Sequence, residues 1–381
     1  MSEDQEHIDD SARYREALQK SLLTDGWEEA FSHNRLRKWV NENRERLAES
    51  ARINLGKSDL AAERHFESVI NNFKPVGQFD LATTDAIFKR HFDEVVQVAG
   101  VLGFQPTRPV ELVTSTSVLA TPFARPTADT HQLFVGLGTS TFCNYWAKAY
   151  SAIVTAVAAP EFEWKPIESI ADLRTRLSRD PSGLVLAGRL SLFYGAFGTL
   201  MGFGEVQQTA AHYPYRVHLL AAMEVFALAH EYGHFLAHER NIEFADDVNL
   251  EYFCDSIGMR LSQEWGAKYN NWLAFVGIGG LVFFRAFEIS ELTALVLAKR
   301  TTDLSAGVAA RIGRNQTSNS HPPASDRADR LITAAIRTVA ADQKEQARRF
   351  AEEYDLICTA INGFVSEMLE STIPAKPESK A

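Results

Sequence analysis

The sequence predicts an α+β protein that is mainly helical. Apolar residues recur at helical spacing along most of the chain, and most clearly over residues 215–240. A shorter block, residues 109–138, is rich in β-branched and small residues and predicts a small sheet. With 381 residues, of which 45% are hydrophobic, the chain is long enough to bury a sizeable core around these elements.

Residues 1–105 are rich in charge and predict an N-terminal helical region. Apolar side chains recur there at near-helical spacing, as at Trp27, Phe31, Leu36 and Val40. The first ten residues or so are acidic and polar instead. We expect them to be disordered, because they offer too little apolar surface to offset the entropy of ordering.

Two strands are predicted next, at residues 109–124 and 130–138, and their spacing suggests a hairpin with a long connection. Residues 139–158 return to helical spacing, and Pro160 marks the end of that helix. Residues 182–207 are apolar and rich in glycine, which fits neither a strand nor a helix clearly. We interpret that segment as a lid or a hydrophobic wall.

The strongest predicted helix spans residues 215–240 and is opened by Pro214. A second helix follows a polar loop and covers residues 250–265, with Asn249 or a neighbour as its N-cap. These two helices carry the residues on which the functional prediction depends.

The apolar run at residues 272–284 predicts a third, buried helix, since it is shorter than the roughly 20 residues that cross a bilayer. The alternative is a membrane-associated helix that continues to residue 298. It would have to accommodate Arg285, Glu288 and Glu291 at a cost of several kcal/mol. The sequence therefore favours a chain with no transmembrane segment, while peripheral membrane contact stays open.

The last third of the chain predicts a loop followed by helices. Residues 314–326 have loop composition, and helical spacing resumes after them. We therefore divide the chain after the N-terminal region into a central domain at residues 106–331, C-terminal helices at 332–372 and a disordered tail at 373–381.

The composition favours a cytoplasmic protein with no nucleic-acid partner. The net charge of −10 argues against a general nucleic-acid binder, whose surface would carry a basic excess. Cys143, Cys254 and Cys358 are odd in number and widely spaced, which predicts neither a disulfide framework nor a thiolate metal site. The polar, acidic N-terminus has no secretory signal.

The pentapeptide His230-Glu231-Tyr232-Gly233-His234 carries the strongest chemical signal. Two imidazoles four residues apart leave the same face of a helix and can bind one metal ion. Glu231 lies about 100° around that helix, where its carboxylate can reach a metal-bound water without becoming a ligand. The pattern predicts one Zn²⁺ ion on His230 and His234, with Glu231 as the catalytic general base.

A catalytic zinc ion needs a third protein ligand, and Glu251 at the start of the next helix is the best candidate. Asp255 lies one turn further on the same face. We expect Asp255 to accept the outer N–H of a zinc-bound histidine, which fixes the tautomer of that ring. Four other residues remain open as the third ligand: His238, Glu239, Asp246 and Asp247.

The sequences HEYGH and EYFCD together resemble the gluzincin pattern of metallopeptidases, which has two histidines on one helix and Glu-x-x-x-Asp on the next. Downstream, the run Ser320-His321-Pro322-Pro323 with Arg327 and Leu331 is similar to a signature of the prenyl-protein and heat-shock membrane endopeptidases and of the phage-exclusion protease Lit. The resemblance covers roughly residues 130–331. It implies a zincin-like catalytic domain whose small sheet places an edge strand beside the active-site helix.

The resemblance also implies roles for residues outside the metal ligands. The strand at residues 130–138 would be the substrate edge strand, with Leu133 and Val135 beside an extended peptide. His321 would polarise the scissile carbonyl or stabilise the oxyanion, the alternative being an ordinary loop residue. Arg327 is expected to pair with a carboxylate under that loop.

These patterns predict a zinc-dependent endopeptidase that acts on an intracellular protein or peptide bound in extended form. One alternative is a catalytically silent zincin-fold module for regulation or defence, with the N-terminal helical region as its interaction surface. Another is a zinc-dependent hydrolase whose substrate is not a peptide.

Overall fold

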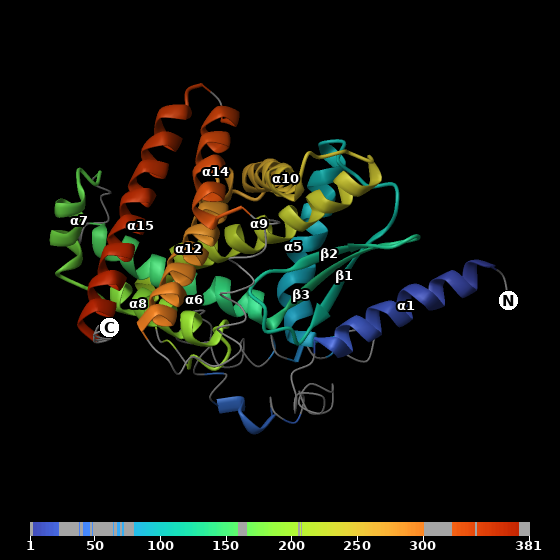
Figure 1. Cartoon of the computed structure of the whole chain (residues 1–381), viewed down its shortest axis with the longest axis horizontal. Helices are drawn as coiled ribbons and strands as arrows, with labels where there is room; N and C mark the ends of the chain where they lie inside the picture. The colour runs from blue at the N-terminus through green and yellow to red at the C-terminus, as the bar shows by residue number, and fades with distance from the viewer. Residues whose placement is uncertain are drawn as a thin grey trace, which may run out of the picture.

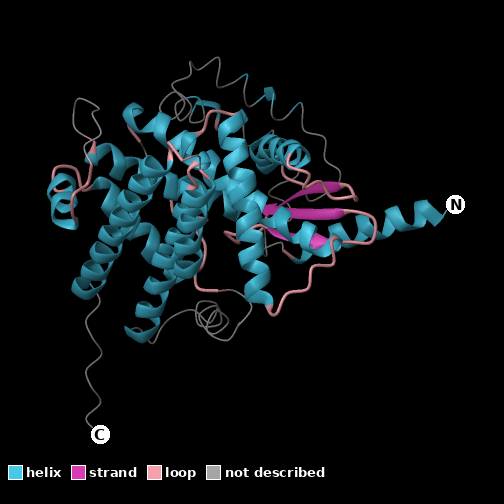
Figure 2. Cartoon of the chain, turned by 90° about the horizontal axis from the view of Figure 1, so that it is seen from above, coloured by secondary structure: helices cyan, strands magenta, loops and turns pink. Residues whose placement is uncertain are grey.

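The computed structural model is mainly helical with one small sheet, which confirms the predicted α+β class. Figures 1 and 2 both show the strands at one end of the helical body. The structure describes residues 3–22, 80–158, 166–204, 208–300, 322–339 and 341–372, with several isolated positions between 38 and 71 and position 206.

The three strands of the described residues form one mixed sheet in the order β1-β3-β2. They are β1 (Val110–Ser115), β2 (Phe123–Pro126) and β3 (His131–Gly136). β3 lies in the middle, parallel to β1 and antiparallel to β2. The predicted simple hairpin is therefore wrong, since the first predicted strand is divided into two that flank the second.

The division follows from a close approach of two backbone segments. A Cβ atom at Gly136 would lie 2.4 Å from the carbonyl oxygen of Ser117, and one at Gly138 would lie 2.2 Å from that of Val118. Glycine at both positions lets the chain after β1 cross tightly over the end of β3 before β2 begins. The sequence pattern of the strands carries no sign of this crossing.

Helix α9 is the central helix of the body and packs against α5, α6, α10, α11 and α12. The helices in chain order are α1 (Glu3–Ser21), α5 (Ala82–Val101), α6 (Leu137–Val157), α7 (Ile170–Leu177), α8 (Ser182–Phe197), the short 3-10 turn η1 (Ala210–His212), α9 (Tyr213–Glu239), α10 (Asp247–Lys268), α11 (Trp272–Phe275), α12 (Ile278–Arg300), α14 (Ala324–Thr338) and α15 (Lys344–Thr372). The segment that the sequence left unassigned thus contributes α8. The helical tail is confirmed, as two helices that stand side by side in Figure 1.

Helix α1 includes residues that the sequence predicted to be disordered. Its C-terminal half is anchored, because Arg15 and Gln19 are buried and Gln19 Nε2 donates to Asp80 Oδ1 at 2.8 Å. Once that half is fixed, each further residue can join the helix at little cost, which explains the extension towards Glu3. The predicted helical spacing between residues 27 and 40 lies outside the described residues.

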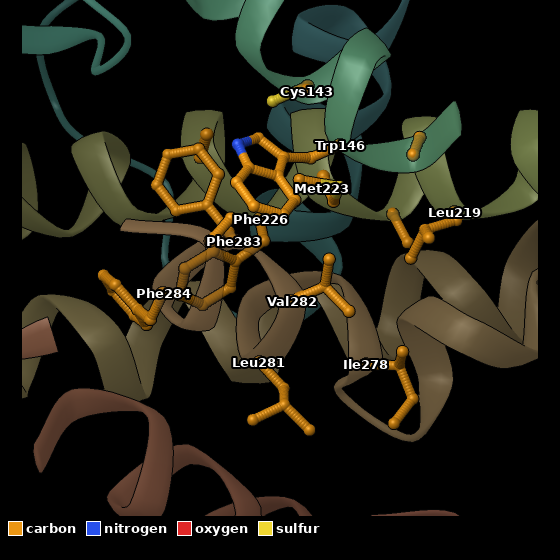
Figure 3. Packing of buried hydrophobic residues seen from close by; sticks show 14 of the residues in the cluster. Cys143, Trp146, Leu219, Met223, Phe226, Ile278, Leu281, Val282, Phe283 and Phe284 are labelled. Atoms are coloured by element: carbon orange, nitrogen blue, oxygen red, sulfur yellow. The ribbon is translucent and has the colours of Figure 1, made fainter. Parts of the chain in front are cut away.

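One hydrophobic core joins the helices around α9. Figure 3 shows its centre, where Trp146 of α6 and Phe226 of α9 meet Phe283 and Phe284 of α12. All three cysteines are buried and unpaired, as expected from their spacing.

The apolar run at residues 272–284 forms two helices where the sequence predicted one. The break lies at Gly277, whose φ of 81° is left-handed and ends the short helix α11. Helix α12 then continues well past Arg285, whose guanidinium binds the carboxylates of Glu288 (2.8 Å) and Asp355 (2.8 Å). Among the described helices, none has the length and apolar character needed to cross a membrane.

Candidate metal centre

Helix α9 carries His230 and His234, and α10 carries Glu251. The two helices meet closely at Gly233, where a Cβ atom would lie 2.9 Å from Cα of Cys254. The glycine that looks like a helix breaker in the sequence is therefore the contact that lets α10 approach. This approach brings Glu251 to both histidines.

The three predicted ligands converge. Their ligand atoms all lie within 4.8 Å of one another. Nε2 of His230 is 3.4 Å from Oε2 of Glu251, and Nε2 of His234 is 3.6 Å from Oε1 of the same carboxylate. Ligand atoms bound tetrahedrally to zinc at about 2.0–2.2 Å are about 3.3–3.6 Å apart. The residues therefore fit a small divalent ion, and two imidazoles with one carboxylate are a donor set that suits zinc.

Asp255 and Arg327 contact the predicted ligands and hold them in place. Nδ1 of His230 lies 3.0 Å from Oδ1 of Asp255, which places the ring proton on Nδ1 and leaves the Nε2 lone pair for a metal ion. Arg327 holds Asp255 through two bonds of 2.9 and 2.6 Å, and its Nη2 is 3.2 Å from Glu251. Its guanidinium also stacks on the Phe284 ring at 4.1 Å. Arg327 does pair with a carboxylate, as expected.

The charges of the group favour a bound cation. Burial lowers the pKa of His230, but hydrogen bonds to Asp255 and Glu251 outweigh that effect and raise it. The same contacts hold the pKa of both carboxyl groups below their usual range despite burial. Because a metal ion and the His230 proton compete for the same nitrogen, metal affinity should rise with pH.

Glu231 lies beside the group without joining it, with its Oε1 4.0 Å from Nε2 of His230. Burial, reinforced by the charge of Glu251, raises its pKa to about 7. The backbone N–H of Ala124 in β2 faces the Glu231 carboxylate and opposes the rise of its pKa. Glu231 is thus a buried carboxylate next to the sheet, with a pKa suited to taking and returning a proton near neutral pH.

The expected substrate edge strand is wrong in its position. Leu133 and Val135 are 0% and 1% exposed and lie in β3, whose two edges are both paired. All six residues of β3 are buried, which is typical of a central strand rather than an edge. The strand that flanks α9 with a free edge is β2, and its Ala124 N–H reaches Glu231.

Asp246 and Asp247, the alternative metal ligands near the start of α10, lie outside the group of converging ligands. Asp246 is the N-cap of α10, and its side chain accepts the backbone N–H of Asn249 at 2.8 Å. The prediction of Asn249 or a neighbour as the N-cap therefore includes the observed cap, Asp246. Asp247 is exposed in the first turn of the helix, outside the group around Glu251.

The buried side chain of His131 has a role that the sequence pattern does not indicate. Nε2 of this buried imidazole lies 2.9 Å from Oε1 of Glu239 at the end of α9. Glu239 also accepts the backbone N–H groups of Thr107 (2.6 Å) and Arg108 (2.9 Å). Two of the alternative ligands are thereby accounted for, since Glu239 ties α9 to the sheet and His238 is exposed. His131 and Glu239 are 108 residues apart, so no local sequence pattern indicates this pair.

The metal centre opens into a cavity of about 1130 Å³. Its walls are residues 119–126 around β2, parts of α8 and α12, and Pro322 with Pro323 beside Arg327. His321, the predicted catalytic loop residue, lies outside the described residues. Its neighbour Pro322 lines the cavity.

No protein-family model, curated protein or solved structure matches this chain. The functional interpretation therefore depends on the residues and geometry of the centre itself. Their chemistry is that of two imidazoles and one carboxylate around one point, with a second carboxylate beside it and a cavity in front.

Proposed function

We propose that this chain is a zinc-dependent endopeptidase of gluzincin type that cleaves a protein or peptide bound in extended form. The observation that carries the proposal is the convergence of His230, His234 and Glu251 beside Glu231 at the wall of an open cavity. A structural zinc site would be closed by a fourth protein ligand, whereas a catalytic site keeps one position for water and substrate. Among the described residues, the group offers three ligands.

His230, His234 and Glu251 would hold the ion, which supplies Lewis-acid polarisation of the scissile carbonyl and a water of lowered pKa. Glu231 accepts the proton of the attacking water at its carboxylate and then donates it to the leaving amine. Glu231 lines the cavity beside the three ligands, where its carboxylate can serve both transfers.

Two further residues assist the ligands: Asp255 orients an imidazole ring, and Arg327 neutralises negative charge. Asp255 holds the His230 ring in the tautomer that ligates through Nε2. Arg327 balances the charge of the two buried carboxylates, Glu251 and Asp255, neither of which would be tolerated alone at this depth. The free edge of β2 faces the same cavity and offers backbone groups to an extended peptide.

The test compares the wild-type protein with Glu231→Gln, and with Glu243→Gln as the matched control at an exposed glutamate. We expect all three to bind one zinc ion, measured by elemental analysis. We expect Glu231→Gln to cleave a proteome-derived peptide library at least about 10³-fold more slowly than the other two, since it lacks the base. A wild-type protein that binds zinc and cleaves no peptide would instead support a silent module or a hydrolase of other substrates.

A further inference from the structure

One wall of the cavity, formed by α8 and α12 next to the candidate metal centre, is largely aromatic. Phe226 begins it, with its ring centroid 6.4 Å from that of His230. Tyr194 of α8 and three phenylalanines of α12 follow along the wall, at 283, 284 and 287. Phe287 is held in place by stacking on the buried ring of Phe142 at 4.3 Å. The aromatic side chains of the wall thus also pack within the hydrophobic core.

Polar groups on this wall are few. The hydroxyl of Ser290 donates to the carbonyl of Ala286 in its own helix at 2.7 Å, so its proton is already used. Glu291 is half-buried and has an interaction of its own. Arg327 stacks on the Phe284 ring, and its guanidinium is already bound to Asp255 and Glu251. Arg125 and His238 line the cavity from β2 and α9. A polar side chain placed against this wall would therefore lose water and gain few hydrogen bonds.

Apolar surface also continues out of the cavity at the end of α8. Leu119 lines the cavity and is 45% exposed, and Phe197, next to the lining residue Gly198, is 64% exposed. The two segments are tied together, since Thr199 Oγ1 donates to the carbonyl of Val118 at 3.0 Å. Exposed apolar side chains that adjoin a cavity are typical of a binding surface.

We infer that the part of the cavity lined by α8 and α12 is the specificity pocket of this site and takes a bulky apolar side chain of the substrate, aromatic or large aliphatic, next to the scissile bond. The inference rests on the proposed function, because the pocket selects a substrate only if the metal centre cleaves one. An aromatic ring suits the wall best, since rings packed edge-to-face or offset against Phe283 and Phe287 add to the gain from burial.

The test uses three zinc-binding hydroxamates of one peptide backbone that differ in a single side chain: phenylmethyl, methyl and aminobutyl. We expect the phenylmethyl probe to bind the zinc-loaded wild-type protein about 10- to 100-fold more tightly than the methyl probe, as burial of the larger apolar area predicts. Affinities are measured by isothermal titration calorimetry. If no probe binds, the metal centre is disproved. If all three bind equally, the metal centre stands and the pocket is disproved.

Two variants fill the pocket, Ala294→Phe and Leu295→Trp, and Leu292→Phe adds bulk to an exposed position of the same helix as the control. We expect the filled pockets to lose the preference for the phenylmethyl probe and to keep wild-type affinity for the methyl probe. The control should keep both. A preference that survives both filling variants, or a tighter aminobutyl probe that would make Glu291 the determinant, overturns the inference.

Discussion

Helix α9 contributes to two buried histidine–carboxylate clusters with similar residues and different chemistry. The candidate metal centre lies around His230 and His234, near the C-terminal end of the helix. Two turns earlier, Glu224 lies 3.6 Å from Nε2 of His91 on α5, and Nδ1 of the same imidazole lies 3.5 Å from Glu94. Both clusters join α9 to neighbouring helices.

The difference between them is where the donor atoms point. Glu251 lies between the Nε2 atoms of two histidines, so three donors face one point. In the second cluster, the two carboxylates lie at opposite nitrogens of one ring, and Glu94 also accepts the indole N–H of Trp265 at 2.8 Å. Neither His91 nor Glu224 is among the residues that line the cavity. Composition alone therefore does not distinguish the two clusters; only the first brings its donor atoms together beside an opening.

The largest expected effect is on zinc binding, and it tests the difference between the two clusters directly. His234→Ala should lower the bound zinc from one ion per chain to almost none, because it removes one of three ligands. His91→Ala should keep one ion per chain, since its ring faces away from the centre. Elemental analysis of both purified variants measures the difference. Zinc lost from His91→Ala with the fold intact by circular dichroism would contradict the assignment.

A smaller effect on zinc affinity is expected from Asp255, which contacts the predicted ligand His230. Asp255→Asn keeps the shape of the side chain but weakens its bond to His230 and the pairing with Arg327. We expect zinc affinity to fall about 10- to 100-fold, the range found for partners of metal-bound histidines. Competition with a chromophoric chelator measures it. Asp247→Asn on the exposed first turn of α10 is the control and should bind zinc like the wild type.

The second cluster should control stability against pH. Burial raises the pKa of Glu224 to about 8, above its ordinary value. Between pH 6.5 and 8 the unfolded chain has Glu224 ionised while the folded chain keeps it protonated, so stability falls as pH rises. The loss is at most about 1.4 kcal/mol per pH unit, or about 2 kcal/mol over this window.

Glu224→Gln should lower the slope measured in chemical denaturation by up to about 1.4 kcal/mol per pH unit, because its amide is neutral at every pH. The slope that remains comes from His230 and Glu231, whose pKa values are also raised in the folded chain. The window starts at 6.5 because burial lowers the pKa of His91, which destabilises the fold as pH falls further. An unchanged slope in Glu224→Gln would show that the carboxyl is already ionised in the folded protein.

The smallest effect is on the free energy of unfolding. It concerns a third histidine–glutamate pair that involves α9, His131 with Glu239. Glu239→Gln keeps one acceptor oxygen but loses the charge that binds Thr107, Arg108 and His131. We expect the free energy of unfolding to fall by about 1 kcal/mol with zinc binding unchanged. Thermal denaturation measures it, and Glu243→Gln should show no shift. A loss of zinc in Glu239→Gln would mean that this pair also positions the centre.

The sequence predicted most of the helices and both histidines, because these features depend on periodicities of a few residues. The two imidazoles share a face of α9 whatever surrounds it, and α9 was the most periodic stretch of the chain. The strands were predicted less well. Which strand lies in the middle depends on pairing between β1 and β3 across the crossing at Gly136 and Gly138, which no local pattern encodes.

The sequence by itself determined that His230, Glu231 and His234 sit on one buried helix, since helical geometry fixes that spacing. Only the tertiary structure decided which of the acidic residues completes the group. Glu251 does so because Gly233 lets α10 approach, while Glu239 and Asp246 are used elsewhere. The tertiary structure also gave β2 the free edge and placed the aromatic wall of α12 beside the centre. These features depend on packing between segments that are distant in the sequence, and a local sequence pattern carries no information about such contacts.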